Sequence, residues 1–355
     1  MRPSGVLLCG AIALAAAAPA GQRSHPSEPQ PSIQREEQSS GTRALLIAVS
    51  AVDERVAWAS GAQGTWVRTI DGGTTWTSGR VPGADSLQFR DVHAVDANTA
   101  YLLSIGNGAQ SRIYKTVDGG ASWTEQFRNA DPAGIYDCFD FWDANRGIAI
   151  GDAIGTEMAV LTTSDDGAHW TRVPASALPA AAAGEGSFAA SGTCVETGPA
   201  GRAWIVMSTP ARSRLLRTTD FGATWRADSL PISSHEGSGA QSVIFRDASH
   251  GMVLGGGYAT VPGDQLVATT ADGGATWRSR TTPALKVGVW GGSWVPGAAV
   301  PTVVAVGPSG AAYSRDEGNS WVPIDTLNYW SVAFASPRAG WAVGTQGRIT
   351  KLSGF

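Results

Sequence analysis

The chain has 355 residues, a formal net charge of −4 at pH 7, 45 glycines and 14 tryptophans, and only 16% of its residues are charged. The negative balance gives no electrostatic reason to expect a nucleic acid as partner, and this composition argues against disorder and coiled coil. After residue 20, no apolar stretch is long enough to span a membrane as a helix.

The first segment has the features of an export signal. Arg2 supplies a short positive region, residues 6–18 are apolar, and Ala18-Pro19-Ala20 offers a small-residue cleavage site. We therefore predict a signal peptide over residues 1–20 and export to the periplasm or the medium. A flexible lead-in, rich in Ser, Pro, Gln and Glu, is expected over residues 21–32.

From residue 69 onward, a phrase of the form Ser/Thr-x-Asp-x-Gly-x-x-Trp occurs six times. The steps from one tryptophan to the next are 47, 47, 55, 52 and 44 residues. Such a period is typical of one repeated supersecondary unit, such as a propeller blade of four short strands. The defining residues of the six copies are Thr69, Asp71, Gly73, Trp76; Thr116, Asp118, Gly120, Trp123; Thr163, Asp165, Gly167, Trp170; Thr218, Asp220, Gly222, Trp225; Thr270, Asp272, Gly274, Trp277; and Ser314, Asp316, Gly318, Trp321.

Each phrase follows three segments that resemble strands. A first strand alternates apolar residues, as in residues 92–95, and a turn such as Asp96-Ala-Asn98 follows it. A second strand of small residues, as in 147–151, precedes a third that runs into the phrase, as in 113–115. A fourth strand begins at the tryptophan. Short strands separated by regular turn signals predict an all-β protein with the architecture of a β-propeller.

A seventh unit lacks the phrase. Residues 330–334, 340–344 and 348–351 match the first three strands, but the sequence ends where the phrase would begin. Residues 33–37 lie at the spacing that a fourth strand keeps from the next unit. We predict seven blades in one domain, residues 33–355, with the N-terminal strand closing the ring and covering an edge that invites aggregation.

The phrase itself is suited to a hairpin between the third and fourth strands. The aspartate and the first hydroxyl can bond backbone N–H groups within the turn, and the glycine can take a positive φ. The tryptophan is expected to bury its ring beneath the turn, with one partner for its N–H. Because the six aspartates are spread over six blades, we assign them to their own turns and exclude them from catalysis.

The phrase resembles the Asp-box, or bacterial neuraminidase repeat, over roughly residues 33–355. Asp-boxes occur in sialidases, in some endoglucanases and xyloglucanases, in sortilin-type receptors, and in photosystem II assembly and stability factors. Ala-Trp-Ala-Ser-Gly (57–61), followed by Thr-Trp-Val-Arg-Thr-Ile-Asp-Gly-Gly-Thr-Thr-Trp (65–76), is most similar to the last group. This resemblance implies a seven-bladed propeller on the lumenal or periplasmic side that binds proteins without catalysis.

A glycoside hydrolase or sialidase-like protein is the enzymatic alternative. Glycosidases need two carboxylates facing one cleft, about 5–10 Å apart, whereas a binding scaffold predicts that no two carboxylates share a pocket. The Arg-Ile-Pro phrase that accompanies sialidases is absent. The candidates by residue type are Asp137, Asp140, Asp152, Glu185 and Glu196.

No cofactor or metal is expected. No Gly-x-Gly-x-x-Gly phrase follows a strand and opens a helix, and the spacing of the five histidines fits no zinc or haem motif.

Two cysteines remain after cleavage, Cys138 and Cys194, each ten positions before a second-strand residue (Ile148 and Trp204). Export permits a disulfide between them. Equivalent positions in neighbouring blades, however, point the same way round the ring. Both a bridge and two buried free thiols stay open, and this argument favours the thiols.

Binding is expected at the mouth of the channel and on the loops of either face. The entrances to the innermost strands supply the candidates Arg90, Tyr136, Asp137, Gln241, Trp290 and Trp330. The aromatic ones could equally fill space between blades. Irregular loops at residues 180–191, 233–239 and 258–264 are expected to decorate one face. The predicted function is an exported, monomeric, non-catalytic scaffold for another protein or peptide, with a glycan as the second possible partner.

Overall fold

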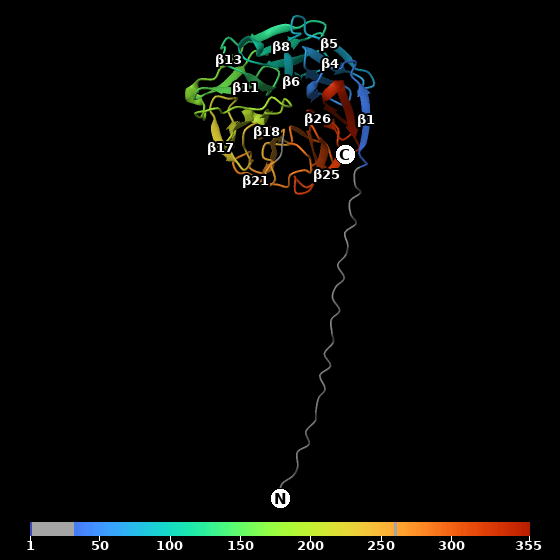
Figure 1. Ribbon diagram of the computed structural model, residues 1–355, viewed down its shortest axis with the longest axis vertical. Helices are drawn as coiled ribbons and strands as arrows, with labels where there is room; N and C mark the ends of the chain where they lie inside the picture. Colours follow the sequence, from blue (N-terminus) through green and yellow to red (C-terminus); the bar gives the residue numbers. More distant parts are fainter. Residues whose placement is uncertain (2–31, 259–260) are drawn as a thin grey trace. The chain divides into compact units, whose positions relative to one another are not determined.

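Seven four-stranded antiparallel sheets surround a central axis, as the ring of blades in Figure 1 shows. The computed structural model describes Met1, residues 32–258 and residues 261–355. The expected all-β, seven-bladed propeller is therefore confirmed. Apart from Met1 and Ser32, the predicted signal peptide (1–20) and lead-in (21–32) lie outside the described residues.

Within each blade the strands follow one another from the axis outward, except that blade 7 takes its outermost strand from the N-terminal end. The strands of blades 1 to 3 are β2 (Leu46–Ala51), β3 (Ala57–Gly61), β4 (Thr65–Thr69), β5 (Thr77–Arg80); β6 (Gln88–Ala94), β7 (Ala100–Ile105), β8 (Arg112–Thr116), β9 (Thr124–Arg128); β10 (Tyr136–Phe141), β11 (Gly147–Ile154), β12 (Glu157–Thr163), β13 (Thr171–Arg172). Those of blades 4 and 5 are β14 (Val195–Gly198), β15 (Arg202–Thr209), β16 (Arg212–Thr218), β17 (Arg226–Leu230); β18 (Ser238–Phe245), β19 (Gly251–Gly257), β20 (Val267–Thr270), β21 (Arg278–Ser279). Those of blades 6 and 7 are β22 (Gly291–Trp294), β23 (Val303–Gly307), β24 (Gly310–Ser314), β25 (Val322–Asp325); β26 (Ser331–Ser336), β27 (Ala339–Val343), β28 (Arg348–Ser353), β1 (Gln34–Ser39).

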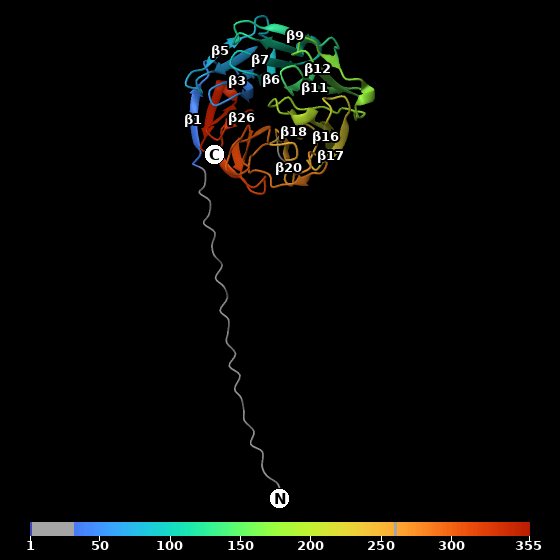
Figure 2. The same ribbon diagram turned by 180° about the vertical axis from the view of Figure 1, so that it is seen from behind.

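The two ends of the propeller meet in blade 7. Strand β1 pairs antiparallel with β28, from Gln34 opposite Ser353 to Ser39 opposite Arg348, and Figures 1 and 2 show β1 in blue beside the red C-terminal strands. The Thr350 hydroxyl also donates to Glu37 Oε1 at 2.6 Å. The predicted closure of the ring by an N-terminal strand is confirmed, and this strand covers the edge of β28.

The hydrophobic core consists of clusters between neighbouring blades. Val67 of blade 1 packs with Trp341 of blade 7, and Leu103 of blade 2 packs in another cluster with Phe139 of blade 3. The second strands are buried on both sides, so that β3 has no exposed residue. Burial on both sides explains why these strands are rich in small and apolar residues and do not alternate with polar ones.

The two faces of the propeller differ in their turns. The innermost strands begin on one face, here called the entry face, and end on the other, here called the turn face. The six repeated turns lie on the turn face, because the third strand of each blade runs parallel to the innermost strand and ends on the same side. Five of these turns also donate a backbone hydrogen bond to the turn between the first two strands of their blade. Gly119 N, for example, donates to Asn98 O at 2.9 Å, and Gly273 N donates to Ser249 O at 2.8 Å.

Each repeated turn is held by the same set of hydrogen bonds. In the first copy Thr69 Oγ1 donates to Asp71 Oδ1 at 2.9 Å and accepts from Gly73 N at 2.8 Å, while Asp71 accepts from the backbone and hydroxyl of Thr75. The bonds from Thr75 lower the pKa of Asp71 to about 2. The aspartates therefore stay ionised and serve their own turns.

The glycine of each turn lies close to the preceding blade. Gly120 has φ +90°, and a Cβ on it would come within 2.5 Å of the Trp66 ring. The turn tryptophans are less buried than expected, since Trp225 has 8% of its surface exposed and the other five are half-buried. The N–H groups of Trp123 and Trp170 have no partner among the described residues, so the expectation of one partner each is wrong for these two.

Candidate functional site

A short segment of blade 4 crosses the central channel. Residues 189–193, here called the plug, precede β14 and are fixed from several blades. Ser191 Oγ donates to Trp290 O at 2.8 Å, and Ser331 Oγ of blade 7 donates to Ser191 O at 2.8 Å. Thr193 Oγ1 donates to Ser242 Oγ of blade 5 at 2.7 Å. Part of the irregular loop 180–191, which we expected to decorate a face, therefore lies inside the channel.

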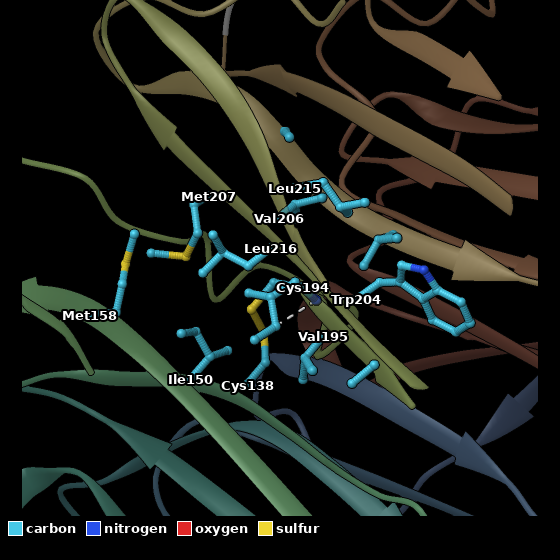
Figure 3. Close-up of a cluster of buried hydrophobic side chains, with 14 of the residues drawn as sticks. Cys138, Ile150, Met158, Cys194, Val195, Trp204, Val206, Met207, Leu215 and Leu216 are labelled. Atoms are coloured by element: carbon cyan, nitrogen blue, oxygen red, sulfur yellow. Dashed lines mark hydrogen bonds between the residues drawn. A yellow bond between two sulfur atoms is a disulfide. The ribbon is translucent and has the colours of Figure 1, made fainter. Parts of the chain in front are cut away.

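The end of the plug is tied covalently to blade 3, the blade before its own. Cys194 follows the plug and forms a disulfide with Cys138 of β10, with their Cα atoms 5.9 Å apart. Figure 3 shows this bond among buried side chains that include Ile150, Val195 and Leu216. The preference for two free thiols is wrong: Cys194 precedes its strand and Cys138 adjoins an irregularity in the pairing of β10, so the two positions are not equivalent.

The entry face is closed by three of the predicted mouth residues. Arg90 of β6 donates to Ala189 O of the plug at 3.0 Å and lies 5.3 Å above the Trp330 ring. The Trp330 ring meets Trp290 edge to face at 4.8 Å, and Trp290 meets the exposed Tyr258 at 4.7 Å. These residues hold the plug in place, and Tyr258, the first residue of the irregular loop 258–264, joins them through Trp290.

The other predicted mouth residues have separate roles. Tyr136 is 4% exposed and packs edge to face on Phe127, so it belongs to the core between blades 2 and 3. Gln241 is 3% exposed and donates to Gly256 O at 2.7 Å. Asp137 is 2% exposed. None of these three side chains offers a free surface to a ligand.

Two of the five candidate carboxyl groups, Asp137 and Asp152, interact at the entry end. Burial raises the pKa of Asp137 well above its usual value, and the charge of Asp152 raises it further. Glu185 forms a buried ion pair with Arg214, with Oε1 2.6 Å from Nε, and thereby holds the loop 180–185 on β16.

The turn face has a large apolar cavity beside the axis. It has a volume of about 540 Å³ and lies between blades 5, 6 and 7, with Glu196 and Thr193 on its axial side. Trp294 is 9% exposed, its N–H donates to Ile244 O, and the Arg246 guanidinium lies 5.3 Å above its ring. The apolar lining residues are Val49, Ile244, Phe245, Trp294, Val295, Pro296, Ala298, Val300, Pro301, Val332, Ala333 and Phe334.

A second, more polar cavity adjoins the first. It has a volume of about 280 Å³, lies over the axis, and has the plug residues Ser191, Gly192 and Thr193 in its lining. Val49, Thr193, Glu196 and Ala333 line both cavities. The two therefore form one depression, here called the open mouth, which the plug separates from the entry face.

Two carboxyl groups of the open mouth have opposite pKa shifts. Burial raises the pKa of Glu196 well above its usual value, and the charge of Asp140 raises it further. Burial would also raise the pKa of Asp140, but hydrogen bonds from His93, Thr197 and Phe141 outweigh it and lower this pKa. The expectation that no two carboxylates share a pocket in a scaffold is therefore not met, since Asp140 and Glu196 line the same cavity.

Hydrogen bonds within the protein occupy both carboxylate oxygens of Asp140. Its Oδ1 lies 3.0 Å from His93 Nδ1 and accepts from Phe141 N at 2.8 Å, and its Oδ2 accepts from Thr197 N at 2.8 Å and from the Thr197 hydroxyl at 2.9 Å. These bonds tie blade 3 to blades 2 and 4. Asp140 thus supplies negative charge to the mouth while its hydrogen-bonding capacity is used within the protein.

The loops of blades 4 and 5 meet on the entry face. Residues from 184–188, 208–210 and 235–238 line a depression of about 270 Å³, and His235 Nε2 lies 3.1 Å from Asp264 Oδ2. The irregular loops 180–191 and 233–239 therefore meet on one face, and Asp264 of the loop 258–264 contacts the second of them. Among the described residues, no group of three or more His, Cys, Asp or Glu side chains is placed to hold a metal ion.

Sequence reasoning missed the principal residues of the apolar cavity. Trp294 ends β22 and Arg246 directly follows β18, so both lie at the opposite ends of these strands from the predicted mouth residues. The connection 295–302 in blade 6 is longer than its counterpart 95–99 in blade 2 and contains two prolines. The longer connection could have indicated a site in blade 6. The distance from Trp277 to Trp321 is only 44 residues, however, so the repeat spacing does not show the lengthening.

The protein is thus a seven-bladed β-propeller in which the plug closes the channel on the entry face and leaves the open mouth on the turn face. Among solved structures, it is similar to YCF48 bound to D1 peptide, with a TM-score of 0.63 and 18% identity over 93% of this chain and 99% of that one. YCF48 from Cyanidioschyzon merolae gives a TM-score of 0.65 and 14% identity over 90% and 98% of the two chains. An ancestral GH74 enzyme gives 0.63 and 12% identity over 88% of this chain and 45% of that chain.

These similarities concern the fold. No family model matches the chain, and no curated protein matches it. Within the described residues, no helix has the length and apolar character needed to cross a membrane.

Proposed function

We propose that this chain is an exported, non-catalytic propeller that binds an extended segment of another protein in the open mouth. The observation that carries this proposal is the pair of adjoining cavities, about 540 Å³ and about 280 Å³, above a plugged channel. A large, mostly apolar concavity with a few polar groups is the usual form of a binding site. The six turns are assigned as Asp-boxes, on their residues and hydrogen bonds, and have an architectural role.

The comparison with YCF48 supports this assignment. YCF48, a photosystem II assembly factor, has been solved with a peptide of D1, so a propeller of similar fold binds a peptide. The resemblance of the repeated phrase to assembly and stability factors points to the same class. Export is proposed from the N-terminal sequence.

The test is to select binding peptides from a random displayed library with the full chain and to map where they bind. Ala333→Arg places a long charged side chain where the two cavities meet. It should abolish binding, because Ala333 lines both cavities. Glu236→Arg, on the exposed entry face, is the matched control and should leave binding intact. Two results would refute the proposal. One is binding that Glu236→Arg abolishes and Ala333→Arg leaves intact; the other is a selection that yields no peptide blocked by Ala333→Arg.

A glycoside hydrolase is the second candidate, because Asp140 and Glu196 line one cavity with pKa values shifted apart. Such a pair is typical of a general acid beside an ionised carboxylate. The four hydrogen bonds to Asp140 argue against it as a base or nucleophile. A screen for reducing ends released from β-glucans and sialosides decides the matter: turnover that Glu196→Gln abolishes would establish a hydrolase, and we expect none. If a glycan binds without being hydrolysed, the partner is a glycan instead of a protein segment, and the open mouth is still the binding site.

A further inference from the structure

Glu196 occupies the junction of the two cavities in the open mouth. It is the second residue of β14, is partly exposed, and lines both the apolar and the polar cavity. The backbone N–H of Phe245 acts on its carboxyl from blade 5 and lowers its pKa, against the effect of burial. A ligand that enters either cavity therefore passes this side chain.

The groups around Glu196 favour a positively charged ligand. Asp140 faces it from β10, and His93 of β6 is hydrogen-bonded to Asp140. The carboxyl group of the buried Asp91 accepts hydrogen bonds from the backbone N–H groups of Val92 and Phe139. On the apolar side, Arg246 is committed to Glu317, with Nη1 2.6 Å from Oε1. No lysine or arginine is among the described residues that line the polar cavity.

The apolar cavity adds a second requirement. Its wall of Trp294, Phe334 and neighbouring aliphatic residues excludes charge, so the adjoining part of the ligand must be an uncharged, apolar side chain. The two cavities meet at Glu196, so both requirements fall on one short stretch of ligand.

Building on the proposed function, we propose that the open mouth recognises an extended segment in which a lysine or arginine lies beside an apolar side chain. The apolar side chain occupies the cavity between blades 5, 6 and 7. The cationic group lies against Glu196 and Asp140 over the axis.

This arrangement couples binding to the release of a proton. A cation beside Glu196 stabilises its carboxylate form, which the free protein disfavours because burial and Asp140 raise its pKa. Affinity for a cationic segment should therefore increase as the pH rises, by up to about tenfold per pH unit while the free protein holds Glu196 protonated.

The experiment selects displayed random peptides against the full-length protein and against Glu196→Gln, at about pH 6 and about pH 8. For the unmodified protein we expect lysine or arginine next to an apolar residue to be enriched, and selected synthetic peptides to bind more tightly at the higher pH. Glu196→Gln should lose both the enrichment and the pH dependence. Glu236→Gln, which removes an exposed carboxyl on the entry face, should keep both.

The possible outcomes separate this proposal from the proposed function. Apolar peptides that bind in the mouth without cation enrichment would overturn the proposed specificity and keep peptide binding. Peptides whose affinity is unchanged in Glu196→Gln and independent of pH would also overturn it. A library with no binder that Ala333→Arg blocks would overturn the proposed function itself.

Discussion

The hydroxyl of Ser331 donates a hydrogen bond of 2.8 Å to the backbone carbonyl of Ser191, 140 residues earlier in the sequence. This bond joins blade 7 to the plug, and Ser191 in turn donates to Trp290 O of blade 6. The plug is thus a shared structural element of several blades, and its removal should affect the ring as a whole.

Gly192 tests the packing of the plug. It has φ +76°, and a Cβ on it would meet Asp91 Oδ1 at 2.3 Å and Ala48 Cβ at 3.1 Å. Gly184 has a similar φ of +68° but open space around its Cβ position. Both Gly→Ala variants incur backbone strain of about 1–2 kcal/mol. Gly192→Ala should lose a further ~1–3 kcal/mol from overpacking, measured by urea unfolding. Equal losses in the two variants would show that the plug is loosely packed.

The disulfide should make a large contribution to stability. Cys138 and Cys194 are separated by 56 residues in sequence, and closing a loop of this size stabilises a fold by about 4 kcal/mol in the chain-entropy model. The double variant Cys138→Ala, Cys194→Ala should show a correspondingly lower urea midpoint. A reductant added during unfolding should lower the midpoint of the natural protein and leave the double variant unchanged. Identical midpoints with and without reductant would contradict the bond.

Stability should pass through a maximum at mildly acidic pH. Asp91, Asp137 and Glu196 have pKa values raised well above normal by burial. Such groups favour the folded state increasingly as the pH falls from neutrality towards about 4, because protonation then favours the fold.

Below that value the repeated turns act in the opposite direction. Hydrogen bonds lower the pKa of Asp118 to about 2, so its contribution is present above about pH 4 and is lost as the pH falls towards 2. Calorimetry across this range should show the melting temperature rising, then falling. Asp137→Asn should reduce the rise in melting temperature between neutral pH and about pH 4, and should leave the fall below pH 4 unchanged. A melting temperature that declines steadily from pH 7 to pH 4 would be inconsistent with this account.

The N-terminal strand should be required for a closed ring. A variant that begins at Ser32 retains β1, whereas one that begins at Gly41 exposes the edge of β28. An uncovered strand edge pairs with other chains, so the shorter variant should elute as larger species in size-exclusion chromatography and melt at a lower temperature. Monomeric behaviour of both variants would mean that blade 7 is stable with three strands.

The repeat architecture could be predicted because each turn carries its own signal. Thr69, Asp71 and Gly73 satisfy one another within five residues, so no distant contact is needed to infer the turn. The spacing of the copies then specifies the number of blades, and the missing seventh copy indicates how the ring closes.

The open mouth could not be predicted in the same way. The plug depends on contacts of Ser191 with Trp290 and Ser331, which lie about 100 and 140 residues away in the sequence. The predicted mouth residues Arg90 and Trp330, at the entrances of the inner strands, hold the plug instead. Burial of Tyr136 likewise depends on Phe127 in the preceding blade, and no local pattern records that contact.

The plug also makes the two faces chemically independent. A solute on the entry face cannot diffuse along the axis to Glu196, because residues 189–193 and the Arg90–Trp330 contact occupy the path. Occupancy of the open mouth therefore leaves the depression between residues 184–188 and 235–238 accessible. Two different partners could be held at once, one on each side, without competing for the same surface.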